Sequence, residues 1–134
     1  MITGFNHFNL TAERRLLDEL REFYIEIVGL EPGARPPFTK FGYWLYAGGQ
    51  PVLHLTEALP HEAPHLNTVS TFNHAAFSCT DLDEVTARLL THGIAHQLGD
   101  VPQSGGRQLF FRDPAGNGVE LHSPPEPATE VIVE

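Results

Sequence analysis

Residues 5–10 read FNHFNL and residues 72–77 read FNHAAF, so one short motif occurs twice in the chain. Each copy carries a histidine at its third position, His7 in the first and His74 in the second. Each copy is followed by a segment with helical periodicity and then by short runs typical of strands. The chain is therefore predicted to be a diverged tandem repeat of two modules.

The last predicted strand of each module carries one more residue of a metal-ligating type. This residue is His54 in the first module and Glu120 in the second, and the separation between them along the chain matches that between His7 and His74 to within one residue. A single histidine in a strand is more often structural or exposed than a ligand. Four ligand-type residues at repeat-equivalent positions favour a shared role. We interpret His7, His54, His74 and Glu120 as one metal site.

Composition is that of a soluble globular protein. The 134 residues are 41% hydrophobic and 19% charged, which suits one compact domain spanning residues 1–134. The formal net charge of -9 repels phosphate backbones and anionic membranes, so neither a nucleic acid nor a membrane is expected as a partner. The single cysteine, Cys79, excludes an internal disulfide and fits a reducing compartment. With no membrane span or signal peptide recognisable, a cytoplasmic protein is expected.

The first module is predicted at residues 2–57. A strand over 2–10 is expected to lead through Thr11, as N-cap, into an amphipathic helix that begins at Ala12 and ends at Gly29. Three further strands are expected at 31–35, 41–47 and 52–56, the last two joined by a hairpin at Gly48-Gly49. Residues 58–70 lack periodicity and are interpreted as a linker.

The second module is predicted at residues 71–123. It should consist of a strand over 71–79, a helix with Asp81 and Asp83 at its N-terminal end and Gly93 at its C-terminal end, and strands over 94–98, 107–112 and 119–123. Residues 124–134 form a tail, in which residues 131–133 could add an edge strand. The predicted fold class is α+β: two tandem βαβββ modules forming a cupped mixed sheet with helices on its convex face.

Strand alternation places His54 and Glu120 on one face of their strands and their apolar neighbours on the other. Imidazole and carboxylate donors suit Fe, Mn, Co, Ni or Zn as a divalent ion, and the lack of thiolates argues against a structural zinc site. Four more side chains are candidates for substrate binding because they share faces of the hairpins at repeat-equivalent positions: Trp44, Tyr46, Phe110 and Arg112. Ordinary packing is an equally good reading of these four.

The run from Phe111 to Leu121, FRDPAGNGVEL, together with the two repeat histidines, resembles the vicinal oxygen chelate superfamily. That superfamily includes glyoxalases, extradiol dioxygenases, fosfomycin-resistance proteins and bleomycin-binding proteins, and the resemblance covers residues 2–123. It implies that His7, His74 and Glu120 hold the metal, while His54 matches a fourth position that is often glutamate in glyoxalases. It also implies a homodimer.

Three classes of function remain open. The first is a metal-dependent lyase or isomerase in which Glu120 or His54 acts catalytically on a small substrate that chelates the metal through adjacent oxygens. The second is an extradiol-type dioxygenase using Fe(II), favoured if His54 is not a ligand. The third is a drug-binding protein or an antibiotic-resistance thiol transferase. The four ligand-type residues favour an enzyme.

Overall fold

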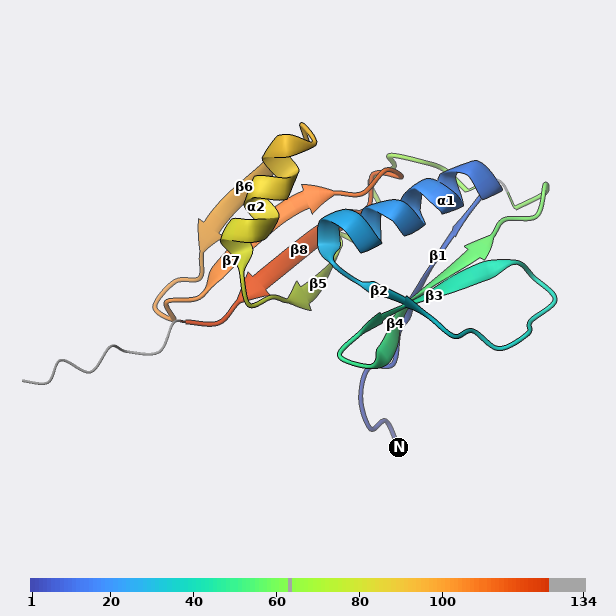
Figure 1. Cartoon of the computed structure of the whole chain (residues 1–134), viewed down its shortest axis with the longest axis horizontal. Helices are drawn as coiled ribbons and strands as arrows, with labels where there is room; N and C mark the ends of the chain where they lie inside the picture. Colours follow the sequence, from blue (N-terminus) through green and yellow to red (C-terminus); the bar gives the residue numbers. More distant parts are fainter. Residues whose placement is uncertain (63, 126–134) are drawn as a thin grey trace, which may run out of the picture. The chain divides into compact units, whose positions relative to one another are not determined.

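The computed structural model describes residues 1–62 and 64–125, and the chain divides into two compact units. Unit 1 comprises residues 1–70 together with 113–117, and unit 2 comprises the remainder. Each unit contains one helical segment and one four-stranded mixed sheet (Figure 1). The predicted α+β class and the tandem βαβββ repeat are therefore confirmed.

Unit 1 is built from β1 (Phe8–Ala12), α1 (Arg14–Phe23), a π-helical turn (Tyr24–Val28), β2 (Glu31–Gly33), β3 (Gly42–Ala47) and β4 (Gln50–Glu57). The sheet order is β1-β4-β3-β2, with β1 parallel to β4 and the other neighbours antiparallel. The helix α1 packs on β1, β3 and β4 and buries Leu17, Leu20 and Phe23. This apolar face is the one that the spacing of hydrophobic residues predicts.

Unit 2 repeats this order with β5 (His74–Ser78), α2 (Leu82–Thr91), β6 (His96–Asp100), β7 (Arg107–Arg112) and β8 (Gly118–Ser123). Its sheet runs β5-β8-β7-β6, and β5 is parallel to β8. Val119 and Leu121 on β8 are buried, and α2 packs against this strand. The oxygen of Asp81 accepts a hydrogen bond from the backbone N–H of Glu84 at 3.0 Å, which caps the helix at its expected end.

The start of α1 corrects the prediction. Thr11 is not the N-cap and Ala12 is not helical, because β1 pairs with β4 residue by residue as far as Ala12 opposite Glu57. The hydroxyl of Thr11 instead lies 3.0 Å from that of Thr56 on β4. Pairing between strands that are distant in sequence therefore overrides the local capping preference, and the helix begins at Arg14. The N-terminal strand is also shorter than predicted, so His7 immediately precedes β1.

The turn between β7 and β8 owes its shape to Asp113, which is 5% exposed. Its carboxylate accepts hydrogen bonds from the backbone N–H of Ala115 and of Asn117, both at 2.9 Å, and from the side-chain amide of Asn117 at 3.0 Å. The buried hydroxyl of Tyr24 donates a fourth bond at 2.7 Å. The Asp-Pro-Ala-Gly-Asn segment is thus a structural turn held by one carboxylate.

The hairpin turn at Gly48 and Gly49 forms where the sequence indicates, with φ of 57° and 78° that suit glycine. The edge strand considered for residues 131–133 lies outside the described residues. None of the helices in residues 1–62 and 64–125 is long and apolar enough to cross a membrane.

Candidate functional site

The four expected metal ligands occur as two pairs, one in each unit. His7 and His54 belong to unit 1, where their rings stack with centroids 3.6 Å apart. His74 and Glu120 belong to unit 2, where Nε2 of His74 lies 3.6 Å from Oε1 of Glu120. Among the residues the structure describes, no three His, Cys, Asp or Glu side chains form one group.

The histidine at the start of each module is held in the same way by the asparagine before it. Nδ1–H of His7 donates to Oδ1 of Asn6, and Nδ1–H of His74 donates to Oδ1 of Asn73, both at 2.7 Å. An amide oxygen can only accept a hydrogen bond, so Nδ1 carries a proton, and in the neutral ring Nε2 keeps its lone pair. This is the tautomer in which an imidazole can bind a metal through Nε2.

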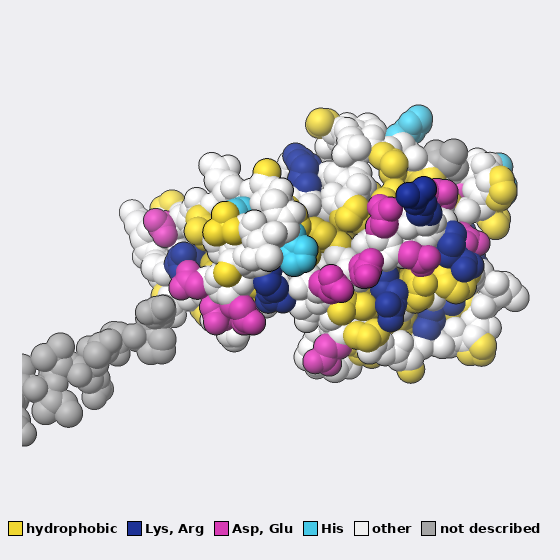
Figure 2. Space-filling view, turned by 45° about the horizontal axis from the view of Figure 1, so that its top comes forward, with side chains coloured by type: hydrophobic (Ala, Val, Ile, Leu, Met, Phe, Trp, Pro, Cys, Tyr) yellow, Lys and Arg dark blue, Asp and Glu magenta, His cyan; other side chains and the backbone are white. Residues whose placement is uncertain are grey.

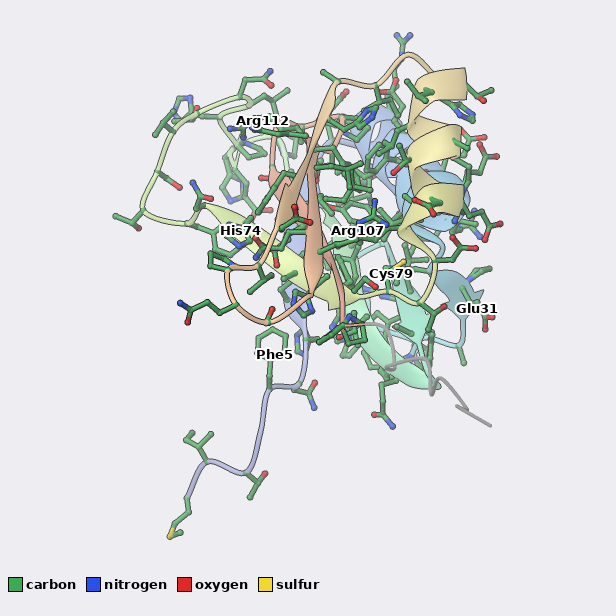
Figure 3. The ribbon with its side chains drawn as sticks, turned by 90° about the vertical axis from the view of Figure 1, so that its left-hand side faces the viewer. Phe5, Glu31, His74, Cys79, Arg107 and Arg112 are labelled. Carbon is green, nitrogen blue, oxygen red and sulfur yellow. The ribbon has the colours of Figure 1, made fainter. Side chains whose placement is uncertain are left out.

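The pair in unit 2 combines an open histidine with a buried carboxylate. His74 lies on the side of the sheet away from α2 (Figure 3), and 38% of its side chain is exposed, whereas Glu120 as a whole is only 7% exposed. The amide of Gln108 on β7 donates to Oε1 of Glu120 at 3.2 Å. A cation would suit this place, because a lone pair of His74 and a carboxylate oxygen face each other there.

Gly118 permits the close approach of β8 to the histidine strand in unit 2. It lies opposite His74 in the parallel pairing of β5 with β8. A side chain at Gly118 would overlap the carbonyl oxygen of Asn73 and come 3.0 Å from Cβ of His74. A side chain at Gly118 would therefore push β8 away from the strand that carries His74.

His54 differs from the other two histidines. Its ring is stacked between His7 and Trp44, whose ring centroid lies 4.1 Å away, and its Nε2–H donates to the carbonyl of Pro51 at 3.1 Å. Burial lowers the pKa of His54, and the nearby His7 lowers it further. The residue is thereby favoured as a neutral imidazole with the lone pair on Nδ1.

One pocket borders both expected ligands of unit 1, and another borders His74 of unit 2 but not Glu120. In unit 1 a pocket of about 560 Å³ is lined by His7, His54 and Trp44, together with Arg35, Phe38 and Lys40. In unit 2 a pocket of about 500 Å³ is lined by His74, Phe110 and Arg112, with the Phe110 ring edge-on to His74 at 6.0 Å. In the antiparallel strand pairing, Trp44 lies opposite His54 in unit 1. Phe110 lies opposite Glu120 at the equivalent position of unit 2.

Tyr46 lies apart from these pockets, because its hydroxyl donates to the carbonyl of Ala34 and its ring covers Gly33 on β2. Sequence reasoning missed Arg35, Phe38 and Lys40. Arg35 directly precedes the Pro36-Pro37 break, and Phe38 and Lys40 follow it. This segment has no periodicity that could have indicated a pocket wall.

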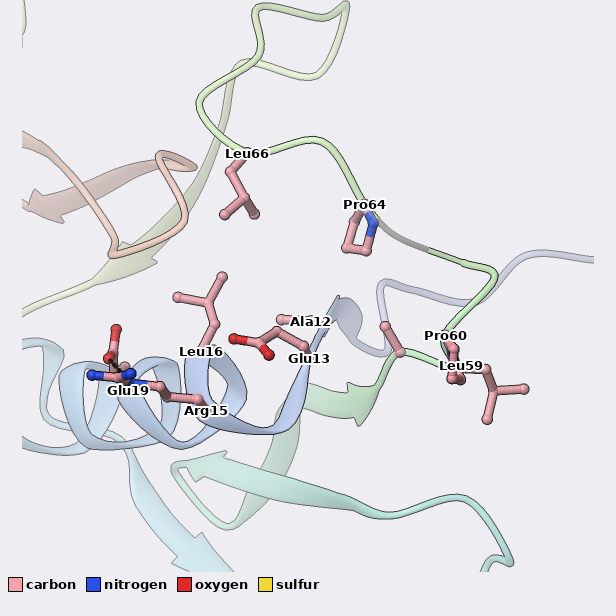
Figure 4. A pocket seen from close by; sticks show the side chains of 10 residues that line it. Ala12, Glu13, Arg15, Leu16, Glu19, Leu59, Pro60, Pro64 and Leu66 are labelled. Carbon is pink, nitrogen blue, oxygen red and sulfur yellow. Dashed lines mark ion pairs between the residues drawn. The ribbon is translucent and has the colours of Figure 1, made fainter.

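Another pocket of about 600 Å³ lies between α1 and residues 58–60 and 64–66 (Figure 4). Its wall is mostly apolar, with Leu16, Leu59 and Leu66, and it carries an ion pair of Arg15 with Glu19 at 3.8 Å. It is lined by none of the four expected metal ligands.

Comparisons with known proteins identify the family of this chain. Residues 4–121 match the family described as the Glyoxalase/Bleomycin resistance protein/Dioxygenase superfamily. A search among curated protein sequences gives no significant match.

Three solved structures illustrate the likeness. One is the E126Q mutant of the fosfomycin resistance protein FosX from Listeria monocytogenes, in complex with Mn(II) and dihydroxypropylphosphonic acid. It is 23% identical, the alignment covers 92% of this chain and 94% of that one, and the TM-score is 0.70. Another is a lactoylglutathione lyase from Agrobacterium tumefaciens: 26% identity, 92% and 95% coverage, TM-score 0.64. The third is TnmS3, an antibiotic binding protein from Streptomyces sp. CB03234: 24% identity, 92% and 97% coverage, TM-score 0.63.

Proposed function

Because this chain belongs to the Glyoxalase/Bleomycin resistance protein/Dioxygenase superfamily, we propose that it is a divalent-metal-dependent enzyme, a lyase or isomerase. Its substrate would be a small molecule that offers two adjacent oxygens to the metal. The observation that carries this proposal is the repeated Asn–His pair, which leaves Nε2 of His7 and of His74 with a lone pair. In unit 2 that lone pair faces the buried carboxylate of Glu120.

His7, His54, His74 and Glu120 are the proposed ligands, and the donor set suits Fe, Mn, Co, Ni or Zn. When bound, such an ion would draw electron density from the two substrate oxygens and so make a neighbouring C–H bond more acidic. Glu120 is the single carboxylate of the set. Its negative charge would offset part of the charge of the ion, which three imidazoles leave unchanged.

The residues of the chain itself would position the substrate and move the proton. The aromatic rings of Trp44 and Phe110 line the pockets next to the ligands, and Arg112 adds a cationic group in unit 2. If Nδ1 of His54 does not bind the metal, it is available to accept a proton at neutral pH. Burial lowers the pKa of this histidine and so favours the neutral imidazole, while Nε2–H is engaged by Pro51. His54 and Glu120 are therefore the proposed catalytic residues.

An extradiol-type dioxygenase using Fe(II) is the second candidate, and the position of His54 favours it. With its ring stacked between His7 and Trp44 and its Nε2–H bound to the carbonyl of Pro51, His54 is held by contacts that do not require a metal. If it stays there, two histidines and one carboxylate remain as ligands, the set used by non-haem iron oxygenases. Three protein ligands leave an octahedral ion room for both a bidentate substrate and dioxygen.

Metal analysis of protein purified without added metal tests the proposal, combined with a spectroscopic ligand count after Co(II) substitution. Metal-dependent exchange of carbon-bound hydrogen of hydroxyacetone with deuterium oxide would support lyase or isomerase chemistry. Oxygen uptake with catechol in the Fe(II)-loaded protein would support the dioxygenase. Absence of stoichiometric metal, together with activity that chelators do not change, would contradict both.

A further inference from the structure

The pocket of unit 1 is locally basic in an acidic protein. The chain has a net charge of -9, and Figure 2 shows acidic and basic side chains interspersed over the face it presents. By contrast, the described residues that line this pocket include Arg35 and Lys40 and no acidic side chain. The proposed ligands His7 and His54 line the same pocket. A negatively charged group would therefore be attracted to the place where the metal is proposed to bind.

Arg35 is held in place, but no carboxylate among the described residues pairs with it. Its Nη2 donates to the carbonyl of Lys40 at 2.9 Å, and its guanidinium carbon lies 5.0 Å from the centre of the Phe38 ring. Gly42 leaves room for the group, since a Cβ there would lie 2.9 Å from Nη2. No acidic side chain in residues 1–62 and 64–125 forms an ion pair with Arg35, whereas Lys40 pairs with Glu62 at 2.8 Å.

Arg35 lines the same pocket as the proposed ligands His7 and His54. The guanidinium is planar and always charged, and it presents paired N–H groups that match the oxygens of a carboxylate or phosphonate. Because Arg35 has no acidic partner in the part of the chain that the structure describes and lies in a basic pocket, it is suited to an anionic ligand.

Two aromatic rings form the wall beside Arg35. Phe38 is 57% exposed, and its ring centroid lies 6.2 Å from that of Trp44, which in turn stacks on His54. An exposed phenylalanine next to a tryptophan on a pocket wall offers a planar, apolar surface to a ligand. The anionic group and the apolar part of one small molecule could both be satisfied here.

We propose that the unit 1 pocket binds a small organic anion, with its planar apolar part against Phe38 and Trp44 and its carboxylate or phosphonate held by Arg35. This inference rests on the proposed function and names the substrate class of the same site. It adds a specificity-determining arginine to the metal ligands. The substrate would then carry both a metal-chelating pair of oxygens and a separate negative charge.

Trp44 is the single tryptophan of the chain, so its fluorescence reports on this pocket alone. The test titrates benzoate, phenylphosphonate and benzamide into the metal-free protein at low salt. Benzamide has the shape of benzoate without its charge. We expect the better of the two anions to quench or shift Trp44 at concentrations about tenfold lower than benzamide does. The order of benzoate and phenylphosphonate identifies which anionic group is preferred.

Matched variants assign the effect to Arg35. Arg35→Met keeps the length of the side chain and should remove the preference for the anion, while Arg35→Lys should retain part of it. Arg15→Met is the control, because Arg15 lies on α1 with an 88% exposed side chain and does not line this pocket. Circular dichroism checks that each variant is folded.

Equal binding of benzoate and benzamide by the wild-type protein would overturn the inference without recourse to any variant. Unchanged anion preference in folded Arg35→Met would overturn it as well. These titrations use metal-free protein, so they can fail while the metal site is real. The reverse outcome, anion binding without metal binding, would contradict the proposed enzyme and leave an anion-binding pocket.

Discussion

Nε2 of His74 and Oε1 of Glu120 lie 3.6 Å apart, although Nδ1–H of the same imidazole is already engaged by Asn73 at 2.7 Å. A neutral histidine in this tautomer presents a lone pair to the carboxylate rather than a proton. Two groups that each present a lone pair to the other repel unless a cation lies between or beside them. That cation can be a proton or a metal ion. This arrangement is the reason to expect a cation at Glu120, and the proposed cation is a metal ion.

Replacement of Asn73 should weaken metal binding indirectly, because Asn73 orients His74 and is not itself a proposed ligand. Asn73→Leu removes the acceptor that fixes the His74 tautomer, and loss of such a partner typically costs about 10- to 100-fold in metal affinity. Asn73→Asp retains an acceptor and should bind metal nearly as well as the wild type. Calorimetric titration of Co(II) into the metal-free proteins measures both. Equal affinity in Asn73→Leu would mean that the asparagine does not position the ligand.

Loss of the Tyr24 hydroxyl should destabilise the fold. Tyr24→Phe leaves the buried carboxylate of Asp113 without one of its four hydrogen bonds, at a cost of about 1 to 3 kcal/mol in the free energy of unfolding. Asp113→Ala should cost more, since it leaves Tyr24 and the turn amides without their acceptor. Urea unfolding at neutral pH measures both changes. A wild-type midpoint in Tyr24→Phe would contradict the structural role of this bond.

The same tyrosine should make stability fall at alkaline pH. Burial raises the pKa of Tyr24 well above its ordinary value, and the negative charge of Asp113 adds to the effect. Above about pH 10 the unfolded chain therefore loses a proton that the folded chain keeps, and the free energy of unfolding decreases as pH rises. The decrease between pH 9 and 11 should be smaller in Tyr24→Phe. Parallel curves for the two proteins would show that Tyr24 does not titrate in this way.

The protein is expected to be a homodimer, in line with the resemblance to a superfamily whose members of this size commonly pair. Sedimentation velocity at micromolar concentration should give a dimer. Mixing a His7→Ala variant with a His74→Ala variant then tells whether one site takes its two pairs from one chain or from two, since mixed dimers recover metal binding in the second case alone. A monomer at every concentration would contradict the expectation.

Much of the architecture could be predicted from the sequence, because periodicity and glycine turns report local structure. The buried face of α1, the hairpin at Gly48 and Gly49, and the cap at Asp81 all follow from such signals. The start of α1 could not be predicted, because the pairing of Ala12 with Glu57 depends on a strand far along the chain.

The candidate site was predictable as a set of repeated residue types and no further. The repeat identifies His7 and His74, yet their tautomers follow from the side-chain geometry of Asn6 and Asn73. Arg35 lies in an irregular segment, and only the folded chain brings it into the pocket that His54 lines. Site residues on strands can therefore be predicted from the repeated pattern. Site residues in irregular segments cannot, because no sequence pattern identifies them.

Titration of Co(II) into the metal-free wild type, Glu120→Gln and His54→Ala tests the central claim most directly. Glu120→Gln keeps the shape of the side chain and removes its charge, so metal binding should be lost or strongly weakened while circular dichroism stays that of the wild type. His54→Ala should cost less affinity if His54 is the optional fourth ligand. Equal affinity in all three proteins would mean that the ion binds elsewhere, and it would contradict the proposed metal site.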